Sequence, residues 1–211
     1  MTAALHFDHP WRIAGGATFV FVVASAVAKQ DPLPQRELDL TTWFNSAPDW
    51  VAHTLWPFMQ LGTVVAPIGF AVVMIVWKRD WWTAAASLVG GIFTWFAAKG
   101  VKEVVQRGRP LQYLPNIDVR EGSGTGLGFI SGHSAVAACT AVIAMTVLPR
   151  KWRPVLVLLP VLVGVGRIVH GVHLPADVVG GWAFGVLTGL GTVELFGRLR
   201  DHFASRAGAT A

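Results

Sequence analysis

The sequence has few charged residues for its length. Only 14% of its 211 residues are Asp, Glu, Lys or Arg, whereas 53% are hydrophobic, and its mean hydropathy is positive. A soluble domain usually carries about a quarter charged residues, so this composition excludes an ordinary soluble domain and indicates a lipid bilayer. At about 20 apolar residues for each spanning helix, these residues allow roughly six spans with short connections and leave no room for a separate soluble domain.

Cysteine is also scarce. Cys139 is the one cysteine, and it lies in an apolar run, so the chain can form no intramolecular disulfide. The formal net charge of +5 could suggest a nucleic-acid partner. However, the basic residues fall between apolar runs and do not form one exposed stripe, so we expect no nucleic-acid binding.

Six apolar runs predict an all-α, polytopic membrane helical bundle of about six transmembrane helices. They extend over approximately residues 13–28, 54–77, 81–98, 135–148, 155–169 and 176–196. We expect the polar stretch 29–49 to be broken up by Pro32, Pro34 and Pro48. We expect residues 1–211 to form a single integral-membrane domain.

The positions of Lys and Arg predict that both termini are cytoplasmic. The proposed inside segments contain Arg12, Lys78, Arg79, Arg150, Lys151, Arg153, Arg198, Arg200 and Arg206. The proposed outside segments contain Lys29, Arg36, Lys99, Lys102, Arg107, Arg109, Arg120 and Arg167. The two totals are nearly equal, but the inside charges are concentrated in very short loops and the tail. Trp11, Trp77, Trp81, Trp82 and Trp152 fall at the proposed cytoplasmic boundary, where interfacial tryptophans are common.

The first apolar run has two interpretations. Arg12, the short apolar run and Ala26-Val27-Ala28 are also features of a cleavable signal peptide. We expect residues 1–28 to be retained as a first helix. Cleavage would leave five spans without changing which side the later loops face.

Three glycines recur every four residues on the last run. Gly181, Gly185 and Gly189 follow Asp177 at this spacing, which indicates a helix face built for close packing. A dimer seam is the alternative, and we expect packing within the same chain.

A first polar cluster follows the third run. Lys102 and Arg109 are seven residues apart, close to two helical turns, so we expect them to share one face of a helix. Pro110 disfavours helix at the residue before it, so this helix should end at Arg109. Taken alone, the cluster could also be a basic flank whose side chains reach the interface.

A second cluster precedes the fourth run. Ser131 and Gly132 lie where a helix should begin, so a hydroxyl and backbone N–H groups converge there and can bind an anion. His133 adds a group that titrates near neutral pH. A plain helix cap with an interfacial histidine is the other interpretation.

A third cluster joins the last two runs. Arg167 lies at the end of one span, and His173 and Asp177 lie on either side of Pro175. The Asp177 carboxylate could bond one imidazole nitrogen, which fixes the tautomer and raises the basicity of the other nitrogen, as in a catalytic triad. A structural ion pair is the alternative.

All three clusters should emerge at the same membrane face. Their three cations, a helix N-terminus and two histidines together favour a phosphate site. His170, His173 and Asp177 also have the spacing of metal ligands, but the neighbouring cations would oppose a bound metal ion. We therefore expect no metal.

The ordered motifs resemble those of the type 2 phosphatidic acid phosphatase family. They are Lys102-x6-Arg109-Pro110, Ser131-Gly132-His133 and Arg167-x5-His173-x3-Asp177. The resemblance extends over a motif-bearing core at about residues 81–195. Two positions differ from the family: Ile130 replaces a usual proline, which removes a rigid start to the helix, and Gly166 replaces a usual serine, which removes a hydroxyl that could face phosphate.

The resemblance implies a metal-independent phosphatase without a cofactor. His173 would attack phosphorus and form a phosphohistidine, Asp177 would hold its ring, and His133 would protonate the leaving oxygen. The implied phosphate-binding residues are Lys102, Arg109, Ser131, Gly132 and Arg167.

The hypothesis is therefore a lipid phosphatase or pyrophosphatase in a bacterial cytoplasmic membrane, with its site on the extracytoplasmic side. Its substrate would be a phosphorylated lipid: a polyprenyl pyrophosphate, phosphatidic acid or phosphatidylglycerol phosphate. Two alternatives stay open. One is a lipid-linked phosphotransferase that uses the same site, and the other is a catalytically silent membrane protein that binds phospholipid.

Overall fold

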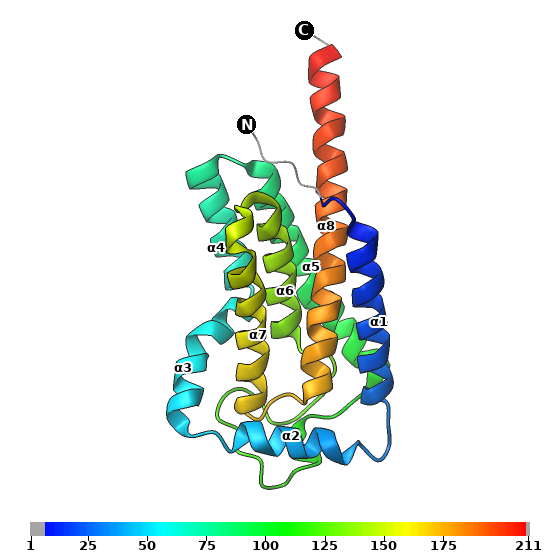
Figure 1. Cartoon of the computed structure of the whole chain (residues 1–211), viewed down its shortest axis with the longest axis vertical. Coiled ribbons are helices and arrows are strands. Elements are labelled where there is room, and N and C mark those ends of the chain that lie inside the picture. The colour runs from blue at the N-terminus through cyan, green and yellow to red at the C-terminus, as the bar shows by residue number, and fades with distance from the viewer. Residues whose placement is uncertain (1–6, 210–211) are drawn as a thin grey trace.

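The computed structural model describes residues 7–209, and its long elements are all helices (Figure 1). The helices are α1 (Pro10–Ala28), α2 (Gln35–Asn45), α3 (Asp49–Met59), α4 (Val65–Val73), α5 (Trp81–Val105), α6 (Gly132–Val147), α7 (Arg153–Val169) and α8 (Pro175–Ala209). Short 3-10 turns occur at Gln60–Gly62, Pro110–Gln112 and Arg150–Trp152, and a π turn at Met74–Lys78. The predicted all-α fold is confirmed.

Four of these helices are long and apolar enough to cross a membrane. They are α1, α5, the segment Arg150–Val169 that includes α7, and α8, and the bent pair of α3 and α4 could supply a fifth span. α5 has 25 residues, about 37 Å at 1.5 Å per residue, which exceeds the hydrocarbon core of roughly 30 Å. α6 is apolar but shorter and packs against α5, α7 and α8. The count of six spans therefore stays a prediction.

The second apolar run does not form one continuous helix. It is divided between α3 and α4, which are bent by 67° where the chain passes Gly62. A Cβ atom on Gly62 would lie 2.6 Å from Cβ of His133. The missing side chain therefore allows this break to lie against the start of α6.

The polar stretch after α1 also differs from the expectation. Its prolines border helices: Pro34 immediately precedes α2, and Pro48 immediately precedes α3. Proline suits such boundaries because it cannot donate a backbone hydrogen bond and restricts its own φ. α2 lies across one end of the bundle (Figure 1). There the Asn45 amide donates to the carbonyls of Asp118 (2.8 Å) and Val169 (3.0 Å).

The glycine face of α8 packs on α6, as predicted for packing within the chain. A Cβ atom on Gly181 would lie 2.6 Å from the Ser131 carbonyl oxygen, and one on Gly189 would lie 2.9 Å from Cβ of Val142. The glycines therefore allow close contact between α8, which carries Asp177, and α6, which carries His133.

The two ends of the bundle are different. The first and last described residues lie at one end, whereas α2 and the loops before α6 and α8 lie at the other (Figure 1). The segment after the sixth run is not a loose tail, because α8 continues to Ala209 and extends beyond the other helices. The three polar clusters thus share the end that is opposite both described termini.

Candidate active site

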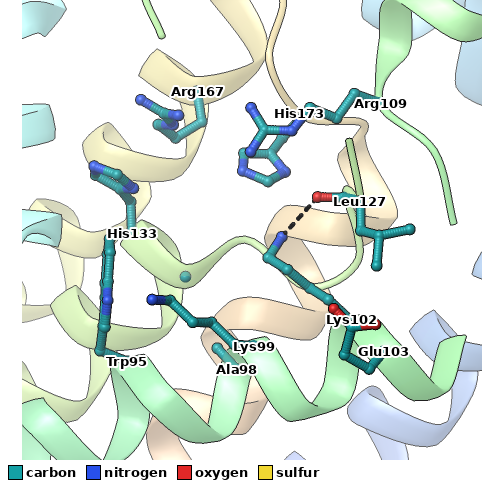
Figure 2. A pocket seen from close by; sticks show the side chains of 11 residues that line it. Trp95, Ala98, Lys99, Lys102, Glu103, Arg109, Leu127, His133, Arg167 and His173 are labelled. Atoms are coloured by element: carbon teal, nitrogen blue, oxygen red, sulfur yellow. Dashed lines mark hydrogen bonds between the residues drawn. The ribbon is translucent and has the colours of Figure 1, made fainter. Parts of the chain in front are cut away.

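A cavity of about 380 Å³ lies where the three polar clusters meet (Figure 2). Its lining includes Lys102, Arg109, Gly132, His133, Arg167 and His173, together with Trp95, Ala98, Lys99, Glu103 and Leu127. The structure thus brings six of the eight predicted site residues to one cavity. The other two, Ser131 and Asp177, are fully buried and do not line it.

His173 lies in the turn between α7 and α8 with its ring against Asp177. Its Nδ1 atom is 3.4 Å from Oδ2 of Asp177, and the same oxygen accepts a hydrogen bond from the Leu174 backbone N–H at 2.9 Å. The predicted contact between this histidine and this carboxylate is therefore present. Because Nδ1 faces Asp177, Nε2 is the ring nitrogen left for a substrate.

The pKa of His173 lies well below its ordinary value of 6.5. Burial is the largest cause, because it disfavours the charged imidazolium, and the nearby positive charges of Lys102, Arg167 and Arg109 act in the same direction. At neutral pH the imidazole is therefore uncharged. This is the form that can attack an electrophile.

The cations of the cavity have different partners. Lys102 Nζ donates to the carbonyl oxygens of Leu127 (3.1 Å) and Gly128 (2.7 Å), and Arg109 donates from Nη1 to the Ser123 carbonyl. The buried Nε atoms of Arg109 and Arg167 have no hydrogen-bond partner within residues 7–209. Both arginine side chains line the cavity, so their positive charges lie where an anion could bind.

Lys102 and Arg109 do not share a helix face. α5 ends at Val105, and Gln106 follows in the left-handed conformation with φ 54°. Arg107 then turns into the protein, where it contacts buried carboxylates. The loop after it returns Arg109 to the cavity, so the two cations meet through the tertiary fold and not through helical periodicity.

Ser131 caps the start of α6, which was the alternative interpretation of this cluster. Ser131 Oγ accepts hydrogen bonds from the backbone N–H of Ser134 at 3.4 Å and from its hydroxyl at 3.0 Å. Gly132 and His133 follow at the cavity wall. The His133 ring lies edge-on to Trp95, with a centroid distance of 5.7 Å. A phosphate contact through the Ser131 hydroxyl stays a prediction, because in this structure that hydroxyl caps the helix.

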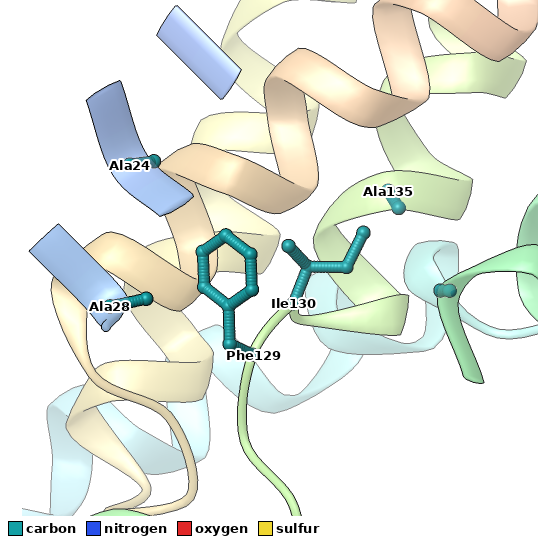
Figure 3. Close-up of a cluster of buried hydrophobic side chains, with 6 residues drawn as sticks. Ala24, Ala28, Phe129, Ile130 and Ala135 are labelled. Carbon is teal, nitrogen blue, oxygen red and sulfur yellow. The ribbon is translucent and has the colours of Figure 1, made fainter. Parts of the chain in front are cut away.

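Ile130 holds the start of α6 by burial. It is fully buried with Phe129 in a cluster that includes Ala24 and Ala28 of α1 and Ala135 of α6 (Figure 3). In a membrane protein such contacts stabilise the fold through close packing of the side chains. Packing therefore holds this position without the rigid ring that a proline would supply.

Gly166 does not face the cavity. A Cβ atom there would lie 2.7 Å from Cγ of Met59 and 3.5 Å from Cβ of Leu55, both on α3. The expectation that glycine removes a phosphate-facing hydroxyl is therefore wrong for this chain. Its lack of a side chain lets α3 approach α7.

Two residues around Asp177 were missed by the sequence analysis. Arg107 Nη1 is 3.1 Å from Oδ1 of Asp177, and Arg107 Nη2 is 2.5 Å from Oε2 of Glu37. Arg107 had appeared only as one of several basic residues of its segment. Glu37 comes from α2, in the stretch expected to be irregular, so no local pattern indicated its role.

His170 does not join His173 and Asp177 in a metal-binding group. Its Nδ1 atom is 2.8 Å from the Gly166 carbonyl oxygen, and its Nε2 atom is 3.9 Å from Oε2 of Glu121. In the part of the chain that the structure describes, no three His, Cys, Asp or Glu side chains are arranged to hold a metal ion.

Comparison with known proteins establishes the family. Residues 80–201 match the model of the PAP2 superfamily, and the chain belongs to this superfamily. It is 26% identical over 119 residues to an undecaprenyl-diphosphatase of Sulfolobus acidocaldarius, covering 56% of this chain and 57% of that protein. It is 37% identical over 106 residues to a decaprenylphosphoryl-5-phosphoribose phosphatase of Mycolicibacterium smegmatis, covering 49% and 54%. The chain thus spans about half the length of these relatives.

Two solved structures have the same fold. The PAP2-type phosphatidylglycerolphosphate phosphatase of Bacillus subtilis aligns with a TM-score of 0.73 and 22% identity over 87% of this chain and 94% of that chain. The LpxE protein of Aquifex aeolicus aligns with a TM-score of 0.67 and 20% identity, over 74% and 94%. The family resemblance is therefore confirmed, and the chain is a multi-pass membrane protein.

Proposed function

We propose that this protein is a metal-independent membrane lipid phosphatase or pyrophosphatase that acts through a phosphohistidine. The observation that carries the proposal is the neutral His173 ring, placed against Asp177 at a cavity lined by Lys102, Arg109 and Arg167. Membership of the PAP2 superfamily supports it, and both sequence relatives are named for polyprenyl-linked phosphates.

The reaction would proceed in two steps. Nε2 of His173 attacks phosphorus as the bond to the leaving oxygen breaks, and His133 donates a proton to that oxygen. Water then attacks the phosphohistidine while His133 takes the water's proton, and the P–N bond breaks to release phosphate. Asp177 would keep the attacking imidazole in the correct tautomer and stabilise its positive charge.

The phosphoryl oxygens would be held by groups of the cavity. Lys102, Arg109 and Arg167 supply positive charge, and Gly132 supplies the backbone N–H at the start of α6. Ser131 reinforces this start as its cap. Fixed cations and N–H dipoles provide most of the stabilisation in phosphoryl transfer.

The wall of the cavity supports a lipid substrate. Trp95, Ala98 and Lys99 of α5 line the cavity, while Phe93 and Phe96 of the same helix are 58% and 63% exposed. In a bilayer this apolar face would contact acyl or prenyl chains. A headgroup phosphate could therefore reach His173 while its tail remains in lipid.

The location in the cell is part of the proposal. We place the protein in a bacterial cytoplasmic membrane with both termini inside and the site on the extracytoplasmic side. The short basic loops support this orientation. The position of the site, at the opposite end of the bundle from both described termini, is consistent with it.

A substrate panel tests the proposed activity. Purified protein in detergent should release inorganic phosphate from a polyprenyl pyrophosphate, phosphatidic acid or phosphatidylglycerol phosphate. With substrate labelled in its terminal phosphate, label that appears on a lipid or sugar hydroxyl would favour the phosphotransferase. Absence of both products across the panel would favour a silent phospholipid-binding protein.

The acid limb of kcat/KM should lie below pH 6.5, the ordinary histidine pKa, because His173 stays neutral to lower pH. Lys102→Met should move this limb to higher pH, since removing a nearby positive charge raises the pKa of His173. The measurement is kcat/KM against pH for both enzymes. Because the substrate titrates identically in the two series, only a change in the enzyme can shift the limb. A limb that moves to lower pH in Lys102→Met would contradict the assignment of this limb to His173.

Turnover should survive treatment with EDTA. Protein cations occupy the positions that would stabilise phosphoryl charge, so no divalent ion is required for this step. The measurement compares phosphate release by EDTA-treated enzyme with and without added Mg²⁺. Loss of activity that a divalent ion restores would overturn the metal-independent mechanism.

A further inference from the structure

A buried row of charges runs from Asp177 away from the cavity. Oδ1 of Asp177 is 3.1 Å from Nη1 of Arg107, and Nη2 of Arg107 is 2.5 Å from Oε2 of Glu37. The exposed fractions of the three side chains are 0%, 1% and 7%. One guanidinium is therefore held between two carboxylates, and only one of these carboxylates touches the reactive histidine.

The second oxygen of Glu37 contacts the helix that carries Asp177. Oε1 accepts a hydrogen bond from the Ala176 backbone N–H at 2.8 Å, in the first turn of α8. A carboxylate at a helix N-terminus is favourable because backbone N–H groups there lack partners within the helix. Glu37 thus holds both the beginning of α8 and the arginine bound to its first acidic residue.

This arrangement controls how Asp177 is shared between the Arg107 guanidinium and the His173 ring. Its Oδ1 faces Arg107, and its Oδ2 contacts Nδ1 of His173 at 3.4 Å. If Glu37 lost its charge, Arg107 would have Asp177 as its remaining acidic partner within residues 7–209. A stronger pull from Arg107 would draw the carboxylate from the imidazole and reduce its ability to stabilise positive charge on the ring.

We infer that Glu37 is a positioning residue for the reaction, acting through Arg107 on Asp177 and so on the His173 ring. The inference rests on the proposed phosphohistidine mechanism. Glu37 lies outside residues 80–201, which match the family model, and it does not line the cavity. α2 is therefore part of the catalytic apparatus although it carries no family motif.

Replacing Glu37 with glutamine should lower kcat by about 10-fold to 100-fold, by analogy with the loss of residues that orient metal ligands. KM should change little because Glu37 does not touch the cavity. Asp39→Asn is the matched control: it removes one acidic charge from the same helix at an exposed position, where Gln35 is its hydrogen-bond partner. It should behave as wild type. A raised KM with unchanged kcat would overturn the inference.

A double-variant cycle separates positioning from general packing. Single-turnover release of labelled phosphate from phosphatidic acid, with enzyme in excess, is measured for wild type, Glu37→Gln, Asp177→Asn and the double variant. If Glu37 acts through Asp177, its effect should shrink to less than about twofold in the Asp177→Asn background. An undiminished effect there would indicate loss of packing and contradict the inference.

Two further variants make the result unambiguous. If Glu37→Gln does not fold, Glu37→Asp is tested; it keeps the charge but is one methylene shorter, and kcat should again fall at constant KM. If His173→Ala keeps its activity, the proposed mechanism itself fails. If His173→Ala is inactive while both Glu37 variants match wild type, only the role of Glu37 is rejected.

Discussion

His173→Ala should lower turnover by at least about 10⁴-fold, the scale seen when a catalytic nucleophile or its base is removed. Alanine leaves no nitrogen to attack phosphorus, so no phosphohistidine can form. The His133 acid and the cavity cations cannot replace that bond. The measurement is phosphate release in detergent, together with acid-labile labelling of the protein by substrate carrying a labelled terminal phosphate. Wild-type protein should be labelled, and the variant should not.

The control for this experiment is His202→Ala, at an exposed position near the end of α8. It should keep normal turnover and labelling. Because His173 is buried, thermal unfolding in detergent must show that His173→Ala is folded. A folded variant with near-normal turnover would exclude His173 as the nucleophile.

Asp177→Asn should have the second-largest effect, a loss of about 10³-fold to 10⁴-fold in kcat by analogy with the orienting carboxylate of a catalytic triad. The amide is nearly isosteric but carries no charge, so it cannot stabilise the positive ring that forms during attack. It can also turn its NH₂ group toward Nδ1 of His173 and favour the wrong tautomer. Steady-state kcat measures the effect.

Stability must be measured alongside this variant. Asp177 also pairs with Arg107 and accepts from the Leu174 N–H, and breaking a buried ion pair costs about 3–5 kcal/mol. The kcat value is therefore normalised to folded protein, and Asp201→Asn, at an exposed position on α8, is the control. A folded Asp177→Asn enzyme within tenfold of wild type would show that the carboxylate does not orient the nucleophile.

Much of the helical fold could be predicted from the lengths of the apolar runs in the sequence. The runs before Lys29 and after Trp81 predicted α1, α5, α6, α7 and α8, because long apolar segments have few alternatives to helix in a bilayer. The three clusters also meet at one end of the bundle, as predicted, because successive helices return the chain to that end. Hydropathy did not locate the bend beside Gly62, since that break depends on contact with the distant His133.

Proline positions and helical spacing predicted the structure of the polar segments less well. Three prolines suggested an irregular stretch, yet Pro34 and Pro48 mark the starts of helices. The seven-residue spacing suggested one helical face for Lys102 and Arg109, yet α5 ends at Val105. After α5 the chain turns so that Arg107 is buried against Glu37 and Asp177, a contact that no local pattern predicts.

The membrane environment and the helical class can be read from the chain, because each depends on residue type and spacing within a short segment, and the ordered motifs also predicted which groups react. The surroundings of Asp177 cannot be read in this way. Arg107 and Glu37 are 70 residues apart, as are Arg107 and Asp177, and Glu37 meets Ala176 across 139 residues. Such charge pairs have no periodic signature in the sequence, and they form because folding buries these groups together, where each must find a partner of opposite charge.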